Sequence, residues 1–167
     1  MRESQDEKWM RHALTEAQLA LKKGEVPVGA VVVYEDKIIG RGHNQVESLK
    51  DPTAHAEVIA IGAASTYLGS WRLSGASLYV TLEPCAMCAG ALVLSRIDRL
   101  VFGAKDPKAG ACGSLYNIVQ DIRLNHQVEI VPYVLEEECS QILQAFFEEV
   151  RQRSLEAKEG NKNGNAE

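Results

Sequence analysis

The chain has 167 residues, with 18 Lys and Arg against 23 Asp and Glu, which gives a formal net charge of -5. Hydrophobic residues make up 46% and charged residues 25%, a composition that excludes a disordered or fibrous chain. The acidic balance argues against a protein that holds nucleic acid by bulk positive charge alone. We expect one domain over residues 1–154 and a polar, disordered tail over residues 155–167, where Gly and Asn are frequent.

Helices and strands are predicted from apolar spacing and from glycine and proline breakers. A first helix is expected over residues 6–23, and strands over 28–34 and 38–43 form a hairpin. A second helix is expected to begin at Asp51-Pro52-Thr53 and to reach residue 68. The later elements alternate: strand 77–82, helix 84–95, strand 99–102, loop 105–113, short helix 115–120, strand 128–134 and helix 136–154.

This order of elements predicts an α/β fold, a three-layer α/β/α sandwich around a mixed five-stranded sheet. After the first hairpin, strands alternate with helices, so most of the sheet is expected to be parallel and covered on both faces. No apolar run approaches the ~20 residues of a membrane span, and the first ten residues lack the apolar core of an export signal. We therefore expect a cytoplasmic protein with no membrane partner.

Two short motifs carry the candidate chemistry. His55-Ala56-Glu57 and Pro84-Cys85-Ala86-Met87-Cys88 each fall at a predicted helix start. Cys85 and Cys88 are three residues apart and lie on one face of a helix, and His55 would add a nitrogen ligand. Three protein ligands leave a fourth position for water, whose pKa a zinc ion can lower to about 7. The set predicts a catalytic zinc centre.

Glu57 follows His55 by two positions, so the two side chains diverge by about 200° on a regular helix. Both can reach one site only if the metal lies beyond the N-terminal end, toward which helical side chains lean. A carboxylate there can take a proton from the metal-bound water and pass it on, as a general base and then a general acid.

Two other interpretations of the cysteines stay open. A redox-active Cys85–Cys88 pair explains neither His55 nor Glu57. A closed structural zinc site needs a fourth ligand. The candidates, none of which is paired at metal-ligand spacing, are Cys112, Cys139, His12, His43 and His126.

Together, HAE and PCAMC resemble the signature of the cytidine-deaminase-like zinc deaminases. Within that superfamily the chain is similar to the bacterial tRNA adenosine deaminases over about residues 8–153. The stretches that carry this similarity are EVPVGAVVV, DPTAHAEVIA, LYVTLEPCAMCAGA, SRIDRLVFGAKDPKAGACGSL and NHQVEI.

The resemblance implies a homodimer that hydrolytically deaminates adenosine to inosine at the wobble position of a tRNA anticodon stem-loop. It implies one Zn²⁺ per subunit on His55, Cys85 and Cys88, with Glu57 as the proton shuttle. Asn44 would hydrogen-bond the adenine. The other implied contacts are pocket walls at Val26 and Leu82, main chain of Ala56 and Cys85 at the reacting end, Asp106 on the neighbouring nucleotide, Lys108 near phosphate, and Arg151 and Arg153 on RNA.

Several conspicuous residues have simpler interpretations. Cys112 is expected to be a small buried or loop thiol, and Cys139 a core residue. His43 is expected at the surface. The aromatic residues at helical spacing, which are Trp9, Phe146 and Phe147, are expected in the core more than as stacking platforms, although the two Phe residues could border the RNA.

Two alternative functions share this metal site. A zinc deaminase of a free base or nucleoside, such as guanine or cytosine, is distinguished by the GAKDPKAG loop and by an insertion that makes the last strand parallel to its neighbour. A zinc-stabilised RNA-binding subunit without activity would need neither Glu57 nor an open metal position. Because the chain is acidic overall, we expect RNA to meet only a local basic rim, which is formed by Lys105, Lys108, Arg151 and Arg153.

Overall fold

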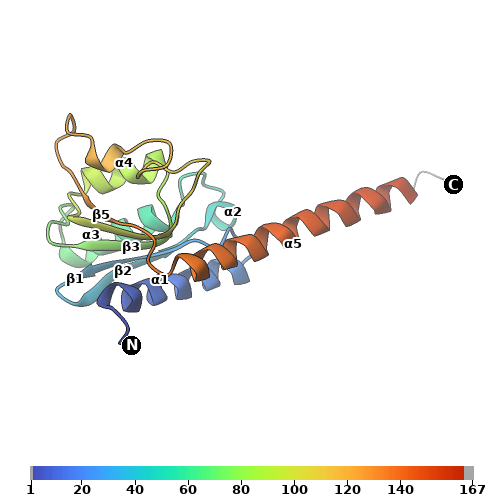
Figure 1. Ribbon diagram of the computed structural model, residues 1–167, viewed down its shortest axis with the longest axis horizontal. Coiled ribbons are helices and arrows are strands. Elements are labelled where there is room, and N and C mark those ends of the chain that lie inside the picture. Colours follow the sequence, from blue (N-terminus) through green and yellow to red (C-terminus); the bar gives the residue numbers. More distant parts are fainter. Residues whose placement is uncertain (1, 164–167) are drawn as a thin grey trace.

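The computed structural model describes residues 2–163 and places a five-stranded sheet between two helical layers (Figure 1). The strand order is β2-β1-β3-β4-β5. The strands are β1 (Gly29–Tyr34), β2 (Lys37–His43), β3 (Ser77–Leu82), β4 (Arg99–Ala104) and β5 (Glu129–Val131). The three-layer sandwich with a mixed sheet is therefore confirmed.

The expectation of a largely parallel sheet is wrong. β1 is antiparallel to both β2 and β3, whereas β4 is parallel to β3 and to β5. The helical connection after β2 makes β3 run in the direction of β2, but β1 lies between them and opposes both. The parallel pairing of β5 with β4 agrees with the prediction for the last strand.

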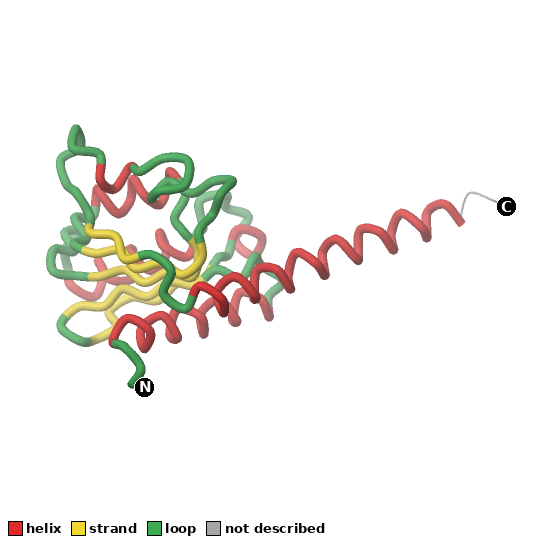
Figure 2. Tube along the Cα trace, viewed as in Figure 1, coloured by secondary structure: helices red, strands yellow, loops and turns green. Residues whose placement is uncertain are grey.

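Side chains alternate along β1 and feed two separate cores. Ala30 and Val32 pack with α3 (Ala56–Leu68) and α4 (Ala86–Leu94), whereas Val31 and Val33 face α1 (Gln5–Lys22). The core on the side of α1 also takes in Cys139 from α5 (Glu136–Asn163). Figure 2 shows the strands enclosed between these helical layers.

Two glycines of β2 let α3 lie directly on the sheet. A Cβ at Gly42 would overlap the main chain of Ala56 and Ala60, and one at Gly40 would overlap the main chain of Ala60 and Ala64. The close approach fixes the first turn of α3 against the end of β2. The residues that precede and begin α3 are thereby held at one end of the sheet.

Several element boundaries differ from the sequence prediction. Residues 51–54 form a turn in which the Asp51 side chain accepts hydrogen bonds from the N–H and O–H of Thr53, so the helix starts later, at Ala56. A separate short helix, α2 (Val46–Leu49), precedes that turn. The expected helix at 115–120 is a 3₁₀ turn, η1 (Ile118–Gln120). Strand β5 covers only residues 129–131 of the expected 128–134.

The last helix is longer than predicted. α5 continues to Asn163 and projects from the body of the molecule (Figure 1), so the expected disordered tail is wrong for residues 155–163. This segment contains two Glu, two Lys, one Leu and one Ala, which favour helix, and no proline. The rest of the expected tail, residues 164–167, lies outside the described residues. Within residues 2–163, no helix combines the length and the apolar character that crossing a membrane requires.

Candidate active site

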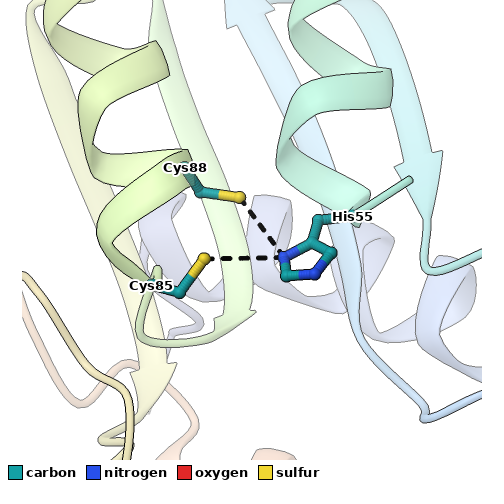
Figure 3. A group of neighbouring side chains, drawn as sticks. All are labelled: His55, Cys85 and Cys88. Atoms are coloured by element: carbon teal, nitrogen blue, oxygen red, sulfur yellow. Dashed lines mark hydrogen bonds between the residues drawn. The ribbon is translucent and has the colours of Figure 1, made fainter. Parts of the chain in front are cut away.

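The predicted metal group is assembled at the starts of two helices. His55 is the N-cap residue of α3, Cys85 is the N-cap residue of α4, and Cys88 lies in the first turn of α4. His55 Nδ1 is 3.6 Å from the Sγ atom of Cys85 and 3.6 Å from that of Cys88 (Figure 3). The three candidate ligand atoms lie within 4.8 Å of one another.

These separations suit a tetrahedral metal ion. Zn–S bonds of about 2.3 Å and Zn–N bonds of about 2.0 Å at tetrahedral angles place sulfur and nitrogen roughly 3.5 Å apart. Both observed Nδ1–Sγ distances are 3.6 Å. Two sulfurs and one imidazole also form a donor set that binds zinc in preference to harder cations. The group therefore fits zinc, with a position left for a further ligand.

The local electrostatics favour the thiolate form of Cys85. Hydrogen bonds from Cys88 and His55 lower the pKa of Cys85 to about 3. The same contact with Cys85 raises the pKa of His55. The pKa of Cys88 is raised because its thiol is the donor in the pair with Cys85. A bound divalent cation would instead lower the pKa of Cys88, since such a cation binds both sulfurs as thiolates.

Glu57 lies in the first turn of α3 and its side chain is buried beside the metal group. Burial raises the pKa of Glu57, and its contact with the Cys88 thiol opposes that rise. The expected divergence from His55 does not arise, because His55 precedes the helix in an extended conformation with φ -80° and ψ 151°. The His55 ring and the Glu57 carboxyl group can therefore both reach one site beyond the N-terminal end of α3.

A cavity of about 410 Å³ opens beside the metal group. It brings together almost all of the residues expected to contact substrate, although they come from separate segments of the chain. They are Val26, Asn44, Ala56, Leu82 and Asp106. Its exposed lining residues, Gly24, Glu47 and Ala109, mark the mouth. Lys108 is exposed next to Ala109 and does not line the cavity.

The amide of Asn44 is held in one orientation by the neighbouring loops. Its Nδ2 donates to the Val26 carbonyl at 3.3 Å, and its Oδ1 accepts the Val46 N–H at 3.2 Å. Asn44 is 9% exposed and lines the cavity. The group is therefore fixed before any ligand enters.

Two buried carboxylates, Glu25 and Glu83, also line the cavity and were not singled out in the sequence for it. The two carboxylates are 1% and 2% exposed. A signal existed for Glu83, which stands between Leu82 and Pro84 at the end of an apolar strand, where an acidic residue is unusual. The signal for Glu25, which follows Lys22, Lys23 and Gly24, was weaker.

The remaining expectations divide. Trp9, Cys112 and Cys139 are buried as predicted. His43 is not at the surface, because its ring is enclosed between Glu16 Oε2 at 3.1 Å and Lys23 Nζ at 3.0 Å. The core prediction is also wrong for Phe147, which is 46% exposed, while Phe146 borders the cavity.

Comparison with known proteins gives matches over most of the chain. The model of the MafB19-like deaminase family matches residues 4–151. The tRNA-specific adenosine deaminase of Bacillus subtilis (strain 168) is 54% identical over 155 residues, which are 93% of this chain and 96% of the relative. The tRNA-specific adenosine deaminase of Aquifex aeolicus (strain VF5) is 52% identical over 145 residues, 87% of this chain and 95% of the relative.

Solved structures share the architecture. One, from a study of A-to-I editing by tRNA:A34 deaminases at the wobble position of transfer RNA, has a TM-score of 0.79 and 44% identity, covering 81% of this chain and 99% of that one. A guanine deaminase from Nitrosomonas europaea has a TM-score of 0.74 at 21% identity, covering 87% of this chain and 86% of that one. At that identity the likeness shows the shared fold alone.

Proposed function

The chain belongs to the deaminase family that includes the tRNA-specific adenosine deaminases, and from this premise we propose that it converts adenosine to inosine at the wobble position of a tRNA anticodon. The observation that carries the proposal is the buried Glu57 beside a three-ligand metal group, in a cavity with a fixed amide at Asn44. A metal scaffold without activity needs neither the carboxyl group nor the cavity.

The proposed cofactor is one zinc ion per subunit, held by His55 Nδ1 and by the sulfurs of Cys85 and Cys88. When bound, zinc supplies a Lewis acid that lowers the pKa of a water molecule in the open position. The N-termini of α3 and α4 both point at this site, and their positive dipole ends favour the two thiolates.

Glu57 moves the protons of the reaction. Water replaces the C6 amino group of adenine, and ammonia leaves, so one carboxyl group must accept a proton and then return it. Glu57 accepts the proton of the attacking water, delivers a proton to N1 of the ring, and assists the departure of ammonia. Burial raises the pKa of Glu57, which suits a group that alternates between the two states.

The other cavity residues select and hold the base. Asn44 hydrogen-bonds the ring, Val26 and Leu82 cover its faces, and the main chain of Ala56 and Cys85 lies at the reacting end. A base enters such a cavity only when it is extruded from its neighbours.

The rest of the anticodon stem-loop stays outside the cavity. Asp106 meets the nucleotide next to the target, with the exposed Lys108 near phosphate. Arg151 and Arg153 lie along α5 beyond Phe146 and meet the RNA farther out. We further propose that the protein acts as a homodimer in the cytoplasm, where its tRNA substrate is found.

One assay tests the function. The zinc-loaded protein is incubated with an anticodon stem-loop that carries a wobble A, and separately with free adenosine, guanine and cytosine, and the products are separated by chromatography. Inosine is expected on the stem-loop, with no turnover of the free compounds. Turnover of free guanine or cytosine alone would identify a free-base deaminase. Binding of the stem-loop without any turnover would identify an RNA-binding subunit.

A further inference from the structure

Glu83 is a buried acidic residue that the proposed reaction does not use. It is 2% exposed, lines the cavity, and stands two residues before the metal ligand Cys85. Residues 105–114, here called the rim loop, close around its carboxylate. The feature to explain is why the wall of the cavity contains a carboxylate at this position.

Both oxygens of Glu83 are occupied by donors from the rim loop. Oε1 accepts the N–H of Asp106 at 3.1 Å and the hydroxyl of Ser114. Oε2 accepts the N–H of Cys112 at 3.1 Å and the N–H of Ser114 at 3.1 Å. A carboxylate offers acceptors only, and all of these partners are donors. Because these donors occupy both oxygens, Glu83 has none left to take part in proton transfer on the base.

In the structure, the rim loop satisfies three of its main-chain N–H groups through Glu83. The N–H groups of Asp106, Cys112 and Ser114 belong to a segment outside the strands and helices, so each needs an acceptor from elsewhere. The loop packs so tightly on Glu83 that a Cβ at Gly110 would overlap the carboxylate. The Glu83 side chain thus holds both ends of the rim loop, at Asp106 and at Ser114.

The loop in turn fixes Asp106. The Asp106 carboxylate accepts hydrogen bonds from the N–H groups of Lys108 at 3.0 Å and Ala109 at 3.2 Å. These bonds fix the orientation of the carboxylate, and Asp106 lines the cavity. The Ala111 N–H also donates to the Pro84 carbonyl at 2.9 Å. The position of Asp106 is therefore set relative to the segment that contains Cys85.

We propose that Glu83 is a positioning residue that holds the rim loop so that Asp106 selects the nucleotide next to the target base. This inference rests on the proposed function, because it assigns Asp106 to RNA. Glu83 links that selection to the reacting atoms, since it is two residues from a metal ligand. The neighbouring nucleotide and the extruded base are thereby held at a fixed separation.

The test compares Glu83→Gln with Asp106→Ala and the double variant, using stem-loops that carry each base beside the wobble A. The amide presents a donor to at least one loop N–H or hydroxyl, so the loop shifts. Glu83→Gln is expected to raise KM about ten-fold with kcat within about three-fold, and to weaken discrimination among neighbouring bases. In the Asp106→Ala background the same change should alter KM by less than about three-fold.

Glu25→Gln is the matched control. Glu25 is equally buried and accepts the N–H groups of Glu47 and Ser48 on the other side of the cavity mouth. Its effect on KM should not depend on the neighbouring base and should add to that of Asp106→Ala. Ser114→Ala removes one donor and keeps the main chain, so it reports the same base-dependent rise in KM if Glu83→Gln fails to fold.

A second readout is independent of catalysis. Amide hydrogen exchange at Asp106, Cys112 and Ser114 should become faster in Glu83→Gln, while exchange within α4 stays unchanged. An unchanged KM with unchanged exchange would overturn the inference, as would additive effects with Asp106→Ala or a loss of bound metal. If the wild-type protein forms no inosine on any stem-loop, the proposed function fails, and the exchange result decides the loop contact separately.

Discussion

The two sides of the substrate cavity are built in different ways. On the metal side, His55, Glu57, Cys85 and Cys88 sit at the first turns of two helices, and each motif spans only a few residues. On the mouth side, Glu25 holds residues 22 and 23 positions away, and Glu83 holds residues 23 to 31 positions away. Local motifs supply the chemistry, whereas contacts between distant segments arrange what meets the substrate.

The difference predicts separable effects. Changes on the metal side should abolish the reaction while leaving RNA affinity largely intact. Changes on the mouth side should alter affinity and preference while leaving the metal in place. A change remote from both sides should alter stability alone.

The largest effect is expected from loss of a metal ligand. Cys88→Ser replaces a buried thiolate ligand with a hydroxyl, a poor zinc ligand, and leaves two strong protein ligands. Metal content should fall at least about ten-fold and inosine formation should be lost. Elemental analysis and the stem-loop assay measure both. Cys139→Ala, a buried cysteine in the other core, is the control and should keep its metal. A fully metallated Cys88→Ser would contradict the ligand set.

The next largest effect is expected from loss of the proton shuttle, Glu57. Glu57→Ala should lower kcat by about 10²- to 10⁴-fold, because general acid–base catalysis contributes on that scale. Zinc content and the dissociation constant for the stem-loop should stay near the wild-type values. Single-turnover inosine formation measures the loss. If the variant retained its turnover, Glu57 could not be the group that moves the protons.

The salt dependence of binding tests the mouth side. The basic rim residues Lys105, Lys108, Arg151 and Arg153 are exposed, but the acidic residues Glu136–Glu138 and Glu148–Glu149 are also exposed on α5. Few phosphates should therefore be neutralised. From about 50 to 200 mM salt, affinity should fall by less than the ~10³-fold that six contacts produce. Titrations of a labelled stem-loop measure the slope, and a steeper one would mean more phosphate contacts than these residues supply.

The smallest effect is expected far from the cavity. Arg99 holds Asp6 through two hydrogen bonds, at 2.7 and 2.8 Å, and Tyr79 donates a third at 2.8 Å. These bonds tie α1 to β3 and β4. Asp6→Asn should lower the free energy of unfolding by about 1–3 kcal/mol at neutral pH, with metal and activity unchanged.

The pH dependence of that loss has a defined sign. The bond with Arg99 lowers the pKa of Asp6 below its ordinary value of 3.8. Its stabilisation is therefore fully present above that value and disappears as the pH falls through the lowered pKa. Urea unfolding of wild type and Asp6→Asn should converge in strong acid. A difference in unfolding free energy between the two proteins that stayed constant or widened in acid would show that the charge of Asp6 does not cause the loss of stability.

Much of the candidate site could be read from the sequence. HAE and PCAMC specify candidate ligands whose spacing and helix starts are local properties, and the structure brings their ligand atoms within 4.8 Å of one another. His43 could not be placed, because it ends strand β2 and its burial depends on Glu16 of α1 and on Lys23, the C-cap residue of α1. The extension of α5 was missed because a polar composition does not separate an exposed helix from a disordered tail.

By itself, the sequence indicated the two layers of helices, the mixed sheet and the candidate metal ligands, because periodicity, breakers and short motifs act over a few residues. Only the tertiary structure decided that β1 lies between β2 and β3, and that Glu25 and Glu83 hold the cavity mouth. The physical reason is that a buried carboxylate is specified by its hydrogen-bond donors. The donors to these two carboxylates are main-chain and hydroxyl groups, which give no residue-type signal until the chain has folded around them.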